Sequence, residues 1–73
     1  MAVQIVMDRS GDSRFPFDPA STEDVADAER RFRQLTNRGF TATARLGPGQ
    51  MKIIRSFDPG VEECVFIPRL VGG

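Results

Sequence analysis

Histidine, tryptophan and tyrosine are absent from this chain of 73 residues, and cysteine occurs once. The lack of histidine removes the commonest general base and metal ligand. A single cysteine cannot form an internal disulfide, and without histidine it cannot belong to a cysteine–histidine metal site. The composition therefore predicts a small domain without a metal site, whose stability rests on its apolar core. Metal-free acid–base catalysis by carboxylates remains open in principle, but no pair of acids suits a deep pocket in so small a fold, so no enzymatic activity is expected.

The chain also has neither an excess of one charge nor a long apolar run. Ten basic residues balance ten acidic ones, so no overall basic field attracts nucleic acid or an anionic membrane. No apolar run approaches the roughly 20 residues that span a bilayer, and the N-terminal sequence does not resemble a signal peptide. We therefore expect no nucleic-acid partner, no membrane partner and a cytoplasmic location.

Two segments before residue 20 have extended character. Val3–Met7 is apolar at alternate positions and also at Val6, which suits a central strand. Residues 13–17 contain two phenylalanines that would point to one face, and they predict either the second arm of a hairpin or an extended loop. Pro16 cannot donate to a strand ladder, so a strand here would be irregular or lie at an edge.

A helix of about four to five turns follows. Ser21 or Thr22 is the expected N-cap, and acidic residues occupy the first turn, where they suit the helix dipole. Gly39 is the expected left-handed residue that ends the helix. Apolar residues recur at spacings of three, four and three, which predicts one buried stripe; they are Val25, Ala28, Phe32 and Leu35.

Three further strands are predicted after the helix. Residues 40–46 alternate, with Phe40, Ala42, Ala44 and Leu46 on one face, and residues 50–57 should pair with them as a hairpin. The last strand ends at Ile67, and the strand after the helix is expected to pair with its neighbour in the sequence, as strands do in a meander. The predicted fold is α+β, with one helix packed on one face of a mostly antiparallel sheet of about four to five strands.

The helix carries a cluster of arginines. Arg30, Arg31 and Arg33 could form a basic face that contacts an acidic partner or a phosphate group. They could equally be solvated charges that pair with neighbouring acids, as Glu29 and Arg33 would at i and i+4. The zero net charge favours the second interpretation. Cys64 is expected to be a buried structural thiol, because no histidine is present to activate it.

The last eight residues have an unusual order: Phe66-Ile67-Pro68-Arg69-Leu70-Val71-Gly72-Gly73. An apolar strand meets a proline, and two glycines follow. Glycine lacks a side chain, so such an end can enter a narrow channel and present its carboxylate to another protein's active site. The alternative is ordinary fraying, since many termini are glycine-rich. We expect a domain over residues 1–68 and a flexible tail over residues 69–73.

This ending is similar to that of the molybdopterin-synthase small subunit and related sulfur carriers, which are ubiquitin-like β-grasp proteins. In that family an aromatic and aliphatic strand precedes a proline, a small apolar segment and Gly-Gly. The present chain departs from the pattern at Arg69, where the sulfur carriers often have a second proline. The order of predicted elements also resembles the β-grasp fold.

The resemblance implies that an adenylating enzyme uses ATP to activate the carboxylate of Gly73. The product would be a thiocarboxylate or a conjugate, and sulfur carrier and protein modifier both remain open. A sulfur acceptor or target protein would be the second partner, and the domain itself would bind no cofactor. The resemblance implies that Gly72 fits the channel and that the partner recognises Arg69, Leu70 and Val71. Phe66 and Ile67 would anchor the tail in the domain.

A different class of function is a small protein-binding module that uses the arginine face of the helix or an edge of the sheet. A domain that contacts RNA is a weaker third alternative. The neutral charge and the lack of tyrosine and tryptophan for base stacking argue against it.

Overall fold

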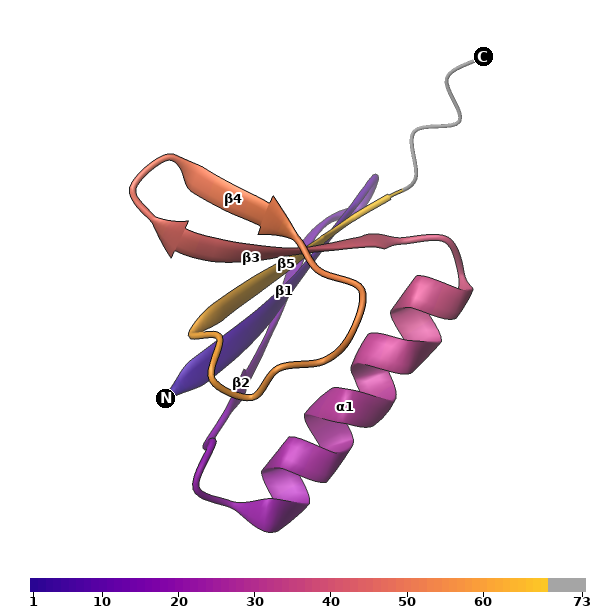
Figure 1. The fold of residues 1–73 in the computed structure, drawn as a ribbon. Helices are drawn as coiled ribbons and strands as arrows, with labels where there is room; N and C mark the ends of the chain where they lie inside the picture. The colour runs from indigo at the N-terminus through magenta and orange to yellow at the C-terminus, as the bar shows by residue number, and fades with distance from the viewer. Residues whose placement is uncertain (69–73) are drawn as a thin grey trace.

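The computed structural model describes residues 1–68, which form a five-stranded sheet with one helix packed on one face (Figure 1). The elements in chain order are β1 (Ala2–Asp8), β2 (Gly11–Phe17), α1 (Thr22–Asn37), β3 (Thr41–Gly47), β4 (Gln50–Ile53) and β5 (Glu63–Ile67). The strand order in the sheet is β2-β1-β5-β3-β4, with β1 and β5 parallel and all other neighbours antiparallel. The predicted α+β class is confirmed, and the arrangement is β-grasp-like.

The N-terminal hairpin settles the question left open for residues 13–17, which belong to a true strand. Asp8 closes the turn, because its Oδ1 accepts hydrogen bonds from the Ser10 amide at 2.7 Å and the Ser10 hydroxyl at 2.6 Å. These bonds lower the pKa of Asp8. Within residues 1–68, β2 pairs with β1 alone, so Pro16 lies in an edge strand, where a missing N–H donor is tolerated.

β5, the last strand in the sequence, lies at the centre of the sheet. It does not follow β4 at the edge; it lies between β1 and β3, with Ile5 opposite Val65 on one side and Thr43 opposite Val65 on the other. The connection over residues 54–62 carries the chain from the edge back to the centre (Figure 1). The predicted pairing of β3 with β4 is confirmed. The central position of β5 was not predicted, because sequence neighbours need not be sheet neighbours when a connection is this long.

The fourth strand is shorter than predicted, since it covers Gln50–Ile53 rather than residues 50–57. Beyond Ile53 the chain leaves the sheet and places Phe57 next to the helix. The Phe57 ring centroid lies 6.0 Å from that of Phe32 and 6.2 Å from that of Phe17. Phe57 is partly buried against these rings, and aromatic contacts of this kind stabilise the fold.

The helix forms as the sequence predicts. Ser21 is the N-cap, and its Oγ accepts a hydrogen bond from the Asp24 amide at 3.3 Å. Gly39 follows the helix with φ of 99°, a left-handed conformation that glycine adopts readily. The buried stripe is confirmed at Ala28, Phe32 and Leu35, while Val25 packs at its margin. The helix therefore covers the sheet with its apolar face.

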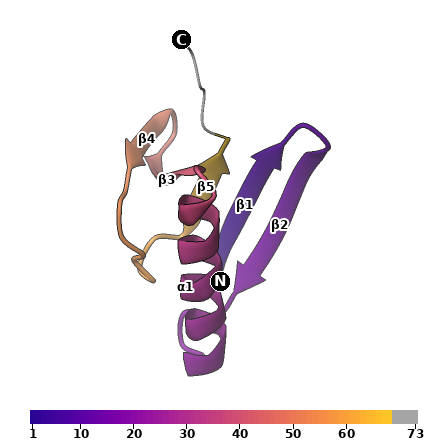
Figure 2. The same cartoon turned by 90° about the vertical axis from the view of Figure 1, so that its right-hand side faces the viewer.

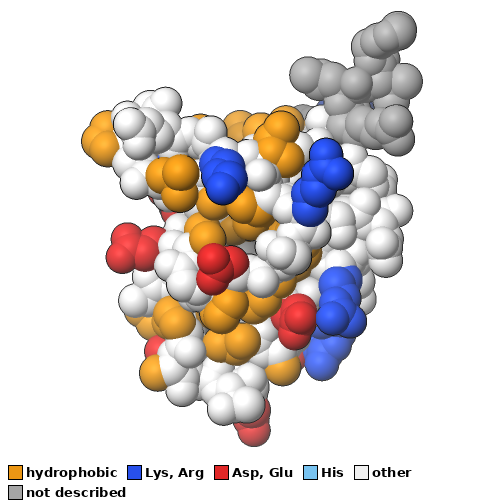
Figure 3. Space-filling model, viewed as in Figure 1, with side chains coloured by type: hydrophobic (Ala, Val, Ile, Leu, Met, Phe, Trp, Pro, Cys, Tyr) orange, Lys and Arg blue, Asp and Glu red, His pale blue; other side chains and the backbone are white. Residues whose placement is uncertain are grey.

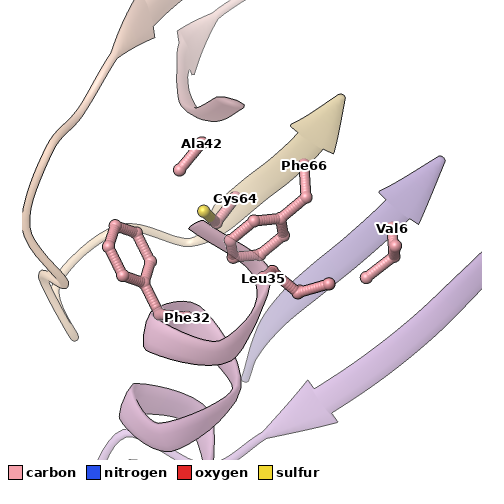
Figure 4. Close-up of a cluster of buried hydrophobic side chains, with 6 residues drawn as sticks. All are labelled: Val6, Phe32, Leu35, Ala42, Cys64 and Phe66. Carbon is pink, nitrogen blue, oxygen red and sulfur yellow. The ribbon is translucent and has the colours of Figure 1, made fainter. Parts of the chain in front are cut away.

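The main core cluster lies between the helix and the centre of the sheet. Its buried members are Val6, Phe32, Leu35, Ala42, Cys64 and Phe66 (Figure 4). The Phe32 and Phe66 rings meet edge to face with centroids 5.6 Å apart. Ala42 and Ala44 are almost fully buried, and their small side chains suit a close approach of the helix to β3.

The β3–β4 hairpin leaves several apolar side chains exposed, and Figure 3 shows hydrophobic side chains on this face of the molecule. A bulge between Arg45 and Gly47 breaks the alternation of β3, so Leu46 is 63% exposed and does not share the buried positions predicted for it. Met51 and Ile53 on β4 are 48% and 64% exposed. Among residues 1–68, no helix has the length and apolar character needed to cross a membrane.

Candidate functional site

The chain reaches its C-terminal segment from the middle of the sheet. β5 pairs with β1 on one side and with β3 on the other, and Ile67 is its last residue. Phe66 is fully buried against the helix, and Ile67 pairs with Thr41. The segment that starts at Pro68 is therefore joined to one of the most firmly held parts of the fold.

The predicted residues of the tail are not placed by the structure. Arg69, Leu70, Val71, Gly72 and Gly73 lie outside the described residues. Their predicted roles in recognition, channel entry and activation therefore stay predictions.

Two of the helix arginines form ion pairs on the solvent-exposed side. The Arg30 guanidinium lies 2.8 Å from an oxygen of Asp27, and that of Arg33 lies 3.3 Å from an oxygen of Glu29. The arginine side chains are 64% and 74% exposed. Exposed pairs of this kind contribute little to stability, roughly 0–1 kcal/mol each. Their geometry matches the interpretation of solvated, paired charges.

Arg31 lies apart from these two residues, on the side of the helix that meets the N-terminal hairpin. Its Nη1 donates a hydrogen bond of 2.8 Å to Oε1 of Gln4, and its guanidinium carbon lies 4.3 Å from the centre of the Phe15 ring. This distance is within the range of a cation–π interaction. The structure thus does not bring the three predicted arginines together into one surface.

Gln4 is the partner that sequence reasoning missed. It is fully buried in β1, and its Nε2 donates a hydrogen bond of 2.9 Å to the carbonyl oxygen of Ala28 in the helix. The amide therefore joins the sheet, the helix backbone and Arg31. A single polar residue within an apolar central strand was the available signal, because a polar group at such a position has to find internal partners.

Cys64 is a buried free thiol in β5, as predicted. Burial raises its pKa to about 11, which keeps the thiol protonated at neutral pH. The thiolate is the nucleophilic form, so this cysteine is poorly suited to covalent chemistry. Within residues 1–68, no histidine, cysteine and carboxylate groups gather in a set that would hold a metal ion.

The chain was compared with protein-family models, with curated proteins and with solved structures, and none of the three comparisons gave a match.

Proposed function

We propose that this protein is a ubiquitin-like carrier or modifier whose Gly73 carboxylate is activated by an adenylating enzyme. The observation that carries the proposal is the combination of a β-grasp-like sheet with a Gly-Gly sequence that follows its central strand. β5 and the buried Phe66 anchor the start of the C-terminal segment in the domain. The residues after Pro68 include two glycines, which have no side chain to obstruct entry into a channel.

The proposed chemistry requires a free carboxylate on Gly73 and a partner that supplies ATP. A carboxylate oxygen attacks the α-phosphorus of ATP, and pyrophosphate leaves. The resulting acyl-adenylate is a better electrophile than the carboxylate, and a sulfur or amine nucleophile displaces AMP from it. Nothing in this sequence of steps requires a catalytic group from the domain, and Cys64 is buried and protonated. The domain serves as the substrate.

Intact-mass spectrometry tests the proposal. The protein is incubated with ATP and a panel of adenylating enzymes, and the expected result is a mass gain of one adenylate, an exchange of oxygen for sulfur, or a covalent conjugate. Two control variants are a deletion of Gly72 and Gly73 and an extension by one residue after Gly73. Both should fold like the wild type by circular dichroism and show no mass change. An identical modification of the deletion variant would refute the proposal.

A second candidate function rests on the β3–β4 edge. Leu46, Met51 and Ile53 are exposed there, and the outer side of β4 has no neighbouring strand within residues 1–68. An extended peptide with apolar side chains could add to this edge as a further strand. Met51→Lys would then weaken partner binding in a pull-down experiment, whereas the deletion of Gly72 and Gly73 would leave it unchanged.

A further inference from the structure

A pocket of about 290 Å³ lies between the N-terminal hairpin and the second half of α1. Figure 2 shows this hairpin alongside the helix. The apolar part of the pocket wall comes from Val6, Phe15 and Leu35, and the polar part includes Arg31, Gln34 and Arg38. The pocket thus combines an aromatic surface with two cationic groups that lie two helical turns apart.

Neither arginine of the pocket has an acidic partner within residues 1–68. Asp27 precedes Arg31 by four residues, but it forms its ion pair with Arg30. On the hairpin, Asp8 is bonded to Ser10 in the turn, and Asp12 lies opposite Met7, on the face of the sheet that is turned away from the helix. Arg31 and Arg38 therefore line one pocket and form no ion pair within residues 1–68.

The guanidinium of Arg31 is held in position before any ligand binds. Gln4 is fully buried, and its Nε2 is committed to the Ala28 carbonyl, so its Oε1 faces Arg31 and accepts from it at 2.8 Å. Phe15 lies against the same guanidinium. An arginine has five N–H donors, and this hydrogen bond uses one. Pre-organised donors bind anions with less loss of side-chain entropy than free ones.

We propose that this pocket binds an anion that carries a carboxylate or phosphate group next to an apolar body. Arg31 and Arg38 would pair with the oxyanion, and the apolar body would lie on Phe15 and Leu35. Gln34 and the Ser13 hydroxyl line the same pocket and supply further hydrogen-bonding groups. Paired arginines are the usual protein partners for oxyanions, because their planar donors match the oxygen geometry.

The C-terminal end of the helix opposes this binding only in part. Helix carbonyls give that end the equivalent of about half a negative charge. Here the carbonyls of Gln34, Leu35 and Thr36 already accept hydrogen bonds from the amides that follow the helix. Two full positive charges exceed the remaining dipole. We expect dissociation constants on the order of 1 mM for simple anions, since the pocket is open to solvent.

NMR titration of the ¹⁵N-labelled full chain at constant ionic strength tests the proposal, with phenyl phosphate as the first probe. Saturable shifts are expected at residues 13–15 and 31–38. Arg38→Gln should weaken binding about tenfold, the effect of losing one charge-assisted hydrogen bond. Arg30→Gln is the matched control, because it makes the same charge change outside the pocket, and it should alter affinity less than about twofold.

Further probes distinguish a carboxylate ligand from a phosphate ligand and test whether the apolar body contributes to binding. Phenylacetate presents a carboxylate, inorganic phosphate lacks the apolar body, and a blocked Phe-Glu peptide presents the carboxylate as a protein would. The proposal predicts that phenyl phosphate or phenylacetate binds more tightly than inorganic phosphate. It is overturned if no probe saturates, or if Arg30→Gln weakens binding as much as Arg38→Gln. Deletion of Gly72 and Gly73 should leave this binding unchanged, so the outcome is independent of the proposed carrier function.

Discussion

Arg31 and Arg33 are two residues apart on one helix, yet their side chains are fixed by different partners. Arg33 is 74% exposed and pairs with Glu29 on the same helix. Arg31 reaches across to the sheet, where Gln4 and Phe15 hold it. A helix rotates by 100° per residue, so two steps carry a side chain to nearly the opposite side. Charge counting along the sequence cannot distinguish a solvated arginine from one that belongs to the packing between helix and sheet.

Loss of Gln4, the partner that Arg31 has and Arg33 lacks, should have the largest effect on stability. Gln4→Ala leaves a cavity, removes a bond to the helix and deprives Arg31 of its acceptor. We expect the free energy of unfolding to fall by about 2–3 kcal/mol, a large share of the total for a chain of this size. Urea denaturation followed by circular dichroism measures the change. Gln34→Ala, at an exposed position, is the control; a loss below about 0.5 kcal/mol for Gln4→Ala would contradict the buried network.

Changing Arg31 itself should have the next largest effect. Arg31→Gln removes the hydrogen bond to Gln4 and the contact with Phe15, and we expect a loss of about 1–2 kcal/mol. Arg31→Lys keeps the positive charge but loses the planar group, so it should recover only part of this loss. The same denaturation experiment compares the two variants, and full recovery by lysine would show that charge alone matters at this position.

The exposed pairs should contribute much less. Arg30→Gln and Arg33→Gln are each expected to lower the free energy of unfolding by less than about 0.5 kcal/mol, because solvent screens exposed ion pairs. If either variant lowers the free energy of unfolding as much as Arg31→Gln does, the exposed ion pairs and the contacts of Arg31 contribute equally to stability, contrary to our expectation.

The smallest expected change in stability is the effect of salt, which should differ between Arg31 and Arg33. Surface ion pairs weaken as the Debye length falls to about 3 Å in 1 M salt. The stability difference between wild type and Arg33→Gln should therefore shrink toward zero between low salt and 1 M sodium chloride. The difference for Arg31→Gln should keep most of its expected value of about 1–2 kcal/mol at 1 M salt, since a hydrogen bond and an aromatic contact depend less on ionic strength. Thermal or urea unfolding at both salt concentrations measures these differences.

Local features of this fold were predictable from the sequence. The cap at Ser21, the stripe on the helix and the left-handed Gly39 depend on residues within a few positions of each other. Alternation along Val3–Met7 also placed Gln4 on the face opposite Ile5. It did not show that the face of Gln4 is the one that the helix covers, because that choice depends on residues far away in the chain.

The long-range features were not predictable in the same way. The insertion of β5 between β1 and β3 pairs residue 3 with residue 63, and no local pattern encodes that register. Phe57 lay within a segment that read as a strand, yet its ring packs against Phe17 and Phe32. Packing against the core overrode the local preference. The arginine pocket depends on the same long-range contacts, since Phe15 and Arg31 meet only after the helix docks on the sheet.

The central position of β5 also has a consequence for the order in which the chain can fold. During synthesis β1–β2 and β3–β4 can form as separate hairpins, but each keeps an inner edge of unpaired backbone groups until β5 joins them. Such edges favour association with other chains. Pairing between the first and last strands is also slow, because a long loop must close. A chain that ends before residue 63 would therefore be prone to aggregation, and only a chain that extends through residue 67 can complete the sheet.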